Sequence, residues 1–234
     1  MKLSRLVQIF MGLALAVSGL LPLPVLAETT TAETPRDAVG RIYTDILRLQ
    51  GEDFYHHVDL ESLTDGFLAE VEPLIRSSKA EAAKNLAADA PVLAKILAGD
   101  NISGAKAAAK SMFLIDTARW FNVPGKGKIV SAFAGDSGVV LAQYREFSQR
   151  KFLEYKGIKY VKEQGDTAVV AVTIRLNLYH ADIQPVAQFK REGGVWRLKQ
   201  ILNVSALVQR VQSLEKARIA SYYAKKKVAA HSGR

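Results

Sequence analysis

Four segments in the second half of the chain alternate apolar and polar residues and are joined by very short connections. These segments cover residues 158–163, 167–179, 185–191 and 195–202. Two of the connections contain glycine, at Gly165 and at the pair Gly193 and Gly194, which is typical of tight turns. Short connections join antiparallel neighbours, because a parallel crossover needs a dozen or more residues. The second half therefore predicts an antiparallel sheet of about four strands.

The first half of the chain follows a helical period instead. Thr34 and Pro35 supply an N-cap and a residue suited to the first helical position. Gly51 is expected to end this helix. The apolar residues in between recur at the spacing of one helical face: Val39, Ile42, Tyr43, Ile46 and Leu49.

Further helical stretches precede the sheet. One begins at Asp59, and we expect Pro73 to kink or split it. Pro91 divides an alanine-rich stretch, residues 79–98, into two short helices, because proline is favoured at the first helical position. Ser103 is placed to cap the next helix.

Helices followed by an antiparallel meander define an α+β fold, with N-terminal helices packed on a curved C-terminal sheet. We expect one domain over residues 28–234: a helical part at about 34–122, a sheet part at about 138–204 and a final helix at about 205–225. A curved sheet closed by helices leaves a mouth in which a ligand can bind. The residues expected to line it are Val170, Val172, Ile174, Leu176, Trp196 and Leu198. The alternative is that they form only the core.

The first 27 residues have the pattern of a secretory signal peptide. Lys2 and Arg5 precede an uncharged apolar stretch that closes with small residues at Val25 and Ala27. We expect a periplasmic or secreted protein, with the segment either removed or kept as an anchor. The 234 residues contain no cysteine, so disulfides do not stabilise the fold.

The rest of the chain is basic. Of 32 basic and 23 acidic residues, the first 27 residues hold two basic and no acidic ones, so 30 and 23 remain and the net charge is +7. Such a surplus favours anionic surfaces, such as a lipid membrane, over nucleic acid, because the chain lacks interleaved aromatic and basic residues. The candidate anion contacts are Lys126, Lys128, Lys225, Lys226 and Lys227.

Few residues offer catalytic or metal-binding chemistry. His56 and His57 lie near Asp53, Asp59 and Glu61, yet this spacing fits no standard ligand motif. We expect this stretch to be a solvated connection between helices. The sequence predicts no metal and no other cofactor.

The run from Gly165 to Val172, followed by a hairpin and by Trp196 on the last strand, resembles the cone fold of nuclear transport factor-like and ketosteroid-isomerase-like domains. The resemblance covers residues 145–204 best and implies a fold more than an activity, since this superfold hosts enzymes, carriers and interaction modules. Two secreted groups look similar. Periplasmic phospholipid-carrier proteins share the leading helices, the Trp strand and a helix that begins like Val204. An exported domain family of unknown function shares a phrase that resembles residues 57–63.

These features favour an exported, non-enzymatic protein that binds an apolar or amphipathic ligand or an envelope protein partner. A phospholipid shuttle of an envelope lipid-transport system is one alternative. A small cofactor-free enzyme of the ketosteroid-isomerase-like type is another, and it would need an acid beside tyrosines in the cone, where Tyr144, Tyr155 and Tyr160 are candidates. A phospholipid shuttle predicts bound acyl chains, and an enzyme predicts a buried acid. A pure interaction module predicts a cone filled by side chains, without a cavity.

Overall fold

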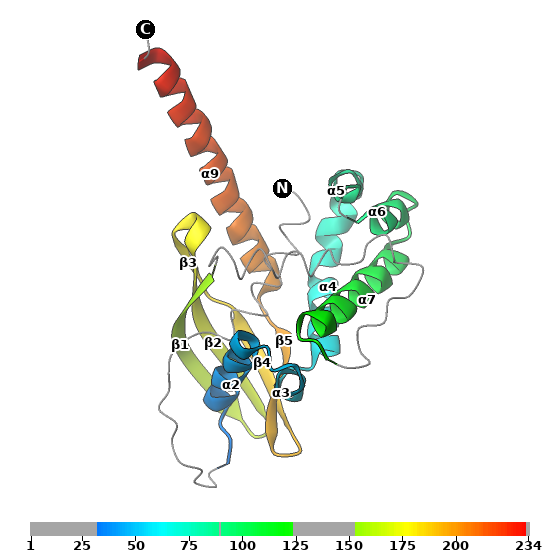
Figure 1. Ribbon diagram of the computed structural model, residues 1–234, viewed down its shortest axis with the longest axis vertical. Coiled ribbons are helices and arrows are strands. Elements are labelled where there is room, and N and C mark those ends of the chain that lie inside the picture. The colour runs from blue at the N-terminus through cyan, green and yellow to red at the C-terminus, as the bar shows by residue number, and fades with distance from the viewer. Residues whose placement is uncertain (1–31, 89, 124–152, 233–234) are drawn as a thin grey trace.

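The computed structural model describes residues 32–88, 90–123 and 153–232 (Figure 1). The helices before the sheet are α2 (Pro35–Arg48), α3 (Gly51–His57), α4 (Leu60–Ser77), α5 (Lys79–Leu86), α6 (Pro91–Ala98) and α7 (Ile102–Trp120). The strands are β1 (Leu153–Gln164), β2 (Thr167–Leu176), β3 (Ala181–Ile183), β4 (Val186–Glu192) and β5 (Val195–Ile201). A long helix, α9 (Val204–Ser232), follows them. The predicted α+β fold, with helices first, an antiparallel sheet and a final helix, is confirmed. A strand opening expected near residue 138 lies outside the described residues.

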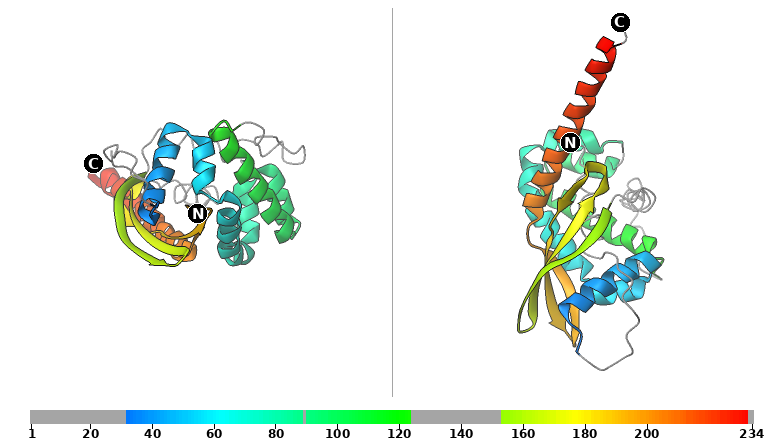
Figure 2. Two further views of the ribbon diagram at one scale, coloured as in Figure 1. Left: turned by 90° about the horizontal axis from the view of Figure 1, so that it is seen from below. Right: turned by 90° about the vertical axis from the view of Figure 1, so that its left-hand side faces the viewer.

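The sheet is antiparallel in every pairing, in the order β1-β2-β4-β5, with the short β3 paired to β2. Figure 2 shows these strands curving around one side of the molecule. The predicted strand over residues 167–179 ends early, because Asn177–Tyr179 form a 3-10 turn and His180 takes a left-handed conformation with φ 50°. β3 then returns along β2, an element that the sequence pattern did not predict.

The inner face of the sheet is filled by large apolar side chains. Trp196 and Leu198 from β5 and Phe189 from β4 are completely buried. Helices α2, α3 and α4 pack on this face, and Ile42 and Leu63 reach the same core. Burying side chains of this size stabilises a fold by about 1.5–3 kcal/mol each.

Helix α2 begins where the sequence predicts but ends earlier than predicted. Thr34 and Asp37 form a capping box at the N-terminus of α2. The prediction that Gly51 ends this helix is wrong. The helix ends at Arg48, Leu49 is an exposed C-cap with φ 54°, and Gly51 is the first residue of α3. A Cβ at Gly51 would overlap the side chains of Phe121 and Val123, so glycine is needed there for close packing.

The next helices also depart from two local predictions. α4 runs through Pro73 as one helix of 18 residues instead of splitting. Pro73 is exposed, so water can bond the carbonyl oxygen that the proline leaves unpaired, while Phe67 and Val71 hold the helix by packing. Asn101, rather than Ser103, caps α7, and its side chain accepts a hydrogen bond from the Gly104 N–H at 2.8 Å. The division of residues 79–98 at Pro91 is confirmed.

Only some of the helices pack on the sheet. α5, α6 and α7 pack on one another and on α4 rather than on the strands, which places them on the far side of α4 from the sheet (Figure 1). We therefore distinguish the sheet core, under α2, α3 and α4, from a helical core formed by α4, α6 and α7.

The sheet core gives a direct stability prediction. We expect Leu198→Ala to lower the free energy of unfolding by about 2–5 kcal/mol, because the truncation leaves a cavity next to Trp196. Leu202→Ala removes the same atoms where the side chain is 42% exposed and should cost less than about 1 kcal/mol. Urea unfolding of both variants checks this, and equal losses would show that the inner face is not the stabilising core.

Candidate functional site

The six residues predicted to line a cavity lie together on the inner face of the sheet. Val170, Val172, Ile174 and Leu176 project from β2, and Trp196 and Leu198 from β5. Five of them have no exposed surface and Leu176 is 7% exposed. They pack in the sheet core, and none of them lines either of the two pockets described below.

The predicted anion contacts are placed only in part. Lys126 and Lys128 lie outside the described residues. Lys225, Lys226 and Lys227 belong to α9. This helix extends beyond the predicted end near residue 225 and continues to Ser232.

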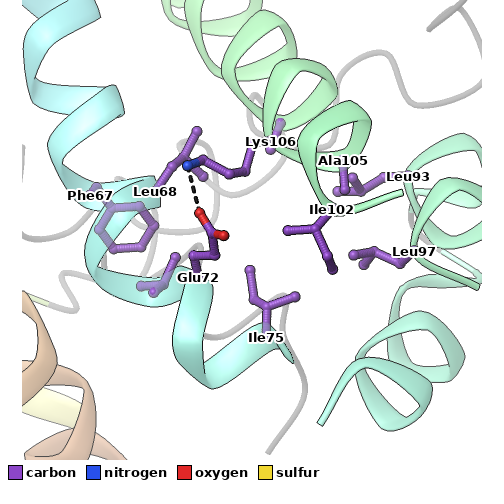
Figure 3. Close-up of a pocket in the computed structure, with 11 residues that line it drawn as sticks. Phe67, Leu68, Glu72, Ile75, Leu93, Leu97, Ile102, Ala105 and Lys106 are labelled. Carbon is purple, nitrogen blue, oxygen red and sulfur yellow. Dashed lines mark hydrogen bonds and ion pairs between the residues drawn. The ribbon is translucent and has the colours of Figure 1, made fainter. Parts of the chain in front are cut away.

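An apolar pocket, here called the helical pocket, lies in the helical core between α4, α6 and α7 (Figure 3). Its volume is about 70 Å³. The side chains that line it are Phe67, Leu68, Val71, Glu72, Ile75, Leu93, Leu97, Ile102, Ala105, Lys106 and Ala109. All but two of these side chains are apolar, so the pocket favours an aliphatic group over a polar one.

The two polar residues of the helical pocket form an ion pair at its rim. Lys106 Nζ on α7 donates to Glu72 Oε2 on α4 at 2.7 Å, and Figure 3 shows the two side chains turned toward one another. Both are partly exposed, so the pair lies where the pocket meets solvent. The hydrogen bond from Lys106 and that from Arg76 hold the pKa of the Glu72 carboxyl below its usual value. Glu72 is therefore an anion at neutral pH.

The pocket exists because α4 contacts two cores at once. Phe67 and Leu68 are both buried although adjacent positions point to different faces of a helix. The adjacent apolar residues Leu74 and Ile75 repeat this arrangement and are partly buried. Such adjacent apolar residues were the available sequence signal for a second contact face on α4. The partner residues on α6 and α7 gave no signal, since α7 is rich in alanine and lacks a clear apolar stripe.

A second, polar recess lies between α2, α3 and β1. Its volume is about 860 Å³, and Tyr155, a predicted cavity residue, is part of its lining. Two side chains of the recess, Asp45 and His57, are themselves buried. The prediction that the histidine pair lies in a solvated connection is wrong for His57, which ends α3 with only 6% of its surface exposed.

His57 is the centre of a buried ion cluster. Its Nδ1 lies 3.0 Å from the Asp53 carbonyl oxygen and 3.6 Å from Asp45 Oδ2, and its Nε2 lies 3.3 Å from Glu33 Oε1. A carbonyl and a carboxylate can only accept, so both ring nitrogens carry a proton. Burial disfavours the charge, but the nearby Asp45 carboxylate and the contacts with Glu33 and Asp53 outweigh it and raise the pKa of His57 to about 9.

Glu33 connects this cluster to the sheet. Its carboxylate accepts from the Trp196 backbone N–H at 3.0 Å, and its carbonyl oxygen accepts from Trp196 Nε1 at 3.0 Å. Arg41 Nε lies 3.2 Å from the same carboxylate. Burial opposes ionisation of Glu33, yet the bonds from His57 and Trp196 lower its pKa. The cluster thus joins the chain before α2, α3 and β5.

The connection between α3 and α4 is also fixed to the sheet rather than solvated. Val58 forms a parallel bridge with Leu198, and the Asp59 N–H donates to the Leu198 carbonyl oxygen at 2.9 Å. Lys199 Nζ donates to Asp59 at 2.8 Å. Although partial burial opposes ionisation, the bonds from Lys199 and Ser62 lower the pKa of Asp59 to about 2.

Two tests for other kinds of site were negative over the described part of the chain. No three His, Cys, Asp or Glu side chains there are arranged to hold a metal ion. None of the helices within the same ranges has both the length and the apolarity that crossing a membrane requires.

Comparison of the chain with protein-family models, with curated proteins and with solved structures found no match.

The ion cluster predicts a specific pH dependence of stability. The pKa of His57 is about 9 in the folded protein and 6.5 as its ordinary value, so the folded state binds the proton more tightly. Its contribution, roughly 3 kcal/mol, is complete below pH 6.5 and is lost as the pH rises to about 9. Urea unfolding from pH 6 to 9.5 should show this loss in the wild type and not in His57→Gln, whereas parallel pH profiles would contradict the charged assignment.

Proposed function

We propose that this protein is an exported, non-catalytic binding protein that takes the aliphatic chain of an amphipathic ligand into the helical pocket. The main evidence for the proposal is the set of side chains that line the helical pocket. Three helices turn apolar side chains toward one space, and the two charged residues among those described, Glu72 and Lys106, lie at its rim. An aliphatic chain with a polar head matches that division.

The size of the pocket limits the ligand. Apolar cavities of about 150 Å³ stay dry and bind a molecule as large as benzene. The helical pocket, at about 70 Å³, accommodates the end of one aliphatic chain. A single-chain amphiphile therefore fits better than the two chains of a phospholipid, and we favour it over the phospholipid shuttle.

The rim ion pair supplies a contact for the head group. Lys106 already pairs with a carboxylate, that of Glu72, across the mouth of the pocket. An anionic head group offers the same chemistry and would compete with Glu72 for the ammonium group. A fatty acid, with one chain and one carboxylate, is the simplest ligand of this class.

The recess near His57 supports an enzyme less well. A buried acid, Asp45, and Tyr155 do lie there, as a ketosteroid-isomerase-like site would require. However, an imidazolium with both N–H groups directed at acceptors has no lone pair with which to take a proton. Asp45 faces that same cation. We therefore assign the ion cluster to stability and not to acid–base catalysis.

Filling the helical pocket should weaken ligand binding. Ala105→Leu and Ala109→Leu each add three carbon atoms to the pocket wall, and we expect the dissociation constant of a fluorescent fatty acid to rise at least about 10-fold. Ala107→Leu is the matched control, because Ala107 lies on the same helix but is exposed. It should bind within about 2-fold of the wild type. Equal binding by all three variants would place the ligand elsewhere.

The rim charges should affect acids and not neutral chains. Lys106→Gln should weaken the binding of palmitate roughly 5-fold, the size of a partly exposed ion pair. Glu72→Gln removes the competitor and should strengthen it. Neither variant should change the binding of hexadecanol, which has no charge. Titration calorimetry of both ligands checks this, and a parallel change for the acid and the alcohol would mean that the rim acts only through packing.

A further inference from the structure

The two ends of the described part of α9 differ in burial. Val204, Leu207, Val208 and Val211 bury the start of the helix in the sheet core. Every residue from 216 to 224, here called the tail segment, is exposed. Figures 1 and 2 show the helix extending away from the body in this region. The tail segment is therefore held outward by a packed base.

The charge of the chain becomes one-sided at the same point. Glu215 is the last acidic residue, and it is buried and bonded to Arg218 at 2.8 and 2.9 Å. The residues after it include no acid and six basic side chains: Lys216, Arg218, Lys225, Lys226, Lys227 and Arg234. A helix with this surplus attracts an anionic surface.

The tail segment also carries large apolar side chains that are exposed in the described part of the chain. Ile219 is 43% exposed, Tyr222 61% and Tyr223 63%. Their spacing of three and four residues places them on one face of the helix. Tyrosine is favoured at membrane interfaces, because its ring has an apolar body and a polar tip. Basic residues flank this face on both sides in sequence, at Lys216 and at Lys225.

A second copy of the chain is a less suitable binding partner for the tail segment. A helix pair needs an apolar seam that repeats every three to four residues over several turns. Continuing the buried positions Val208 and Val211 by that repeat reaches Glu215, Arg218 and Tyr222. A charged pair interrupts the seam where the exposed segment begins. The repulsion between two such basic helices would oppose pairing further.

We propose that the tail segment of α9, together with Lys225, Lys226 and Lys227 that follow it, is a docking site for an anionic lipid bilayer. The helix lies on the lipid surface, with Ile219, Tyr222 and Tyr223 inserted among the head groups and the lysines paired with lipid phosphates. This inference rests on α9 alone and not on the helical pocket, although the two together would bring an amphiphile-binding site to a membrane.

Sedimentation with lipid vesicles tests the proposal on the full chain. The wild type should bind vesicles that mix phosphatidylglycerol with phosphatidylcholine and should dissociate from them at high salt. It should not bind vesicles of phosphatidylcholine alone. The charge reversal K225E/K226E/K227E should lower the partition coefficient at least about 100-fold, and Y222S/Y223S about 10-fold.

A matched charge reversal controls for net charge. Lys84, Lys95 and Lys162 are exposed on other elements, so K84E/K95E/K162E changes the total charge equally and should cost less than about 10-fold. Equal losses in the two triple variants would overturn the docking site, as would a wild type that ignores anionic vesicles. A chain that dimerises through Tyr222 and Tyr223 and leaves the vesicles unbound would overturn it in favour of a second copy. Palmitate binding, unchanged in these variants, separates this result from a failure of the pocket.

Discussion

Burial of the inner face of the sheet is the constraint on which the rest of the structure depends. Trp196 lies in this core, completely buried, and both of its N–H groups donate to Glu33. Because α2, α3 and α4 fill the space over this face, the side chains that could have formed a cavity there pack against one another. An open apolar space is found instead on the other side of α4, where α6 and α7 meet it.

Local patterns in the sequence predicted the fold class and most of the elements, but not α3 or β3. Alternation and short turns gave the strands, and Thr34, Pro35 and Pro91 gave helix starts. The failures share a physical cause, which is tertiary packing overriding a local preference. Gly51 is needed where Phe121 and Val123 approach and not as a helix end, and packing carries α4 through Pro73. For the site, alternation correctly grouped the inner-face residues, but whether such a face is filled depends on the helices above it. The helical pocket joins residues from three helices, which no local pattern relates.

Charge is used in two different ways in this chain. The His57 and Asp45 side chains are buried, the partly buried Glu33 lies against His57, and the three hold the helices to the sheet, so their charges are compensated within the fold. Arg41 and Lys199 extend the same kind of compensation around them. The last part of α9 is the opposite case, since its basic residues have no acidic neighbours in the sequence after Glu215. We therefore assign the paired charges to stability, and the basic stretch without acidic residues to binding.

The position of a bound fatty-acid chain tests the assignment of the helical pocket most directly. A fatty acid that carries a photoreactive diazirine at the end of its chain can be bound to the purified protein, activated by light and located by mass spectrometry of the peptides. We expect labels on the walls of the helical pocket, at residues such as Leu68, Leu97 and Ala105. Labels on β2 and β5, around Val172 and Trp196, would contradict this assignment, because they would show that the sheet core opens to take the ligand.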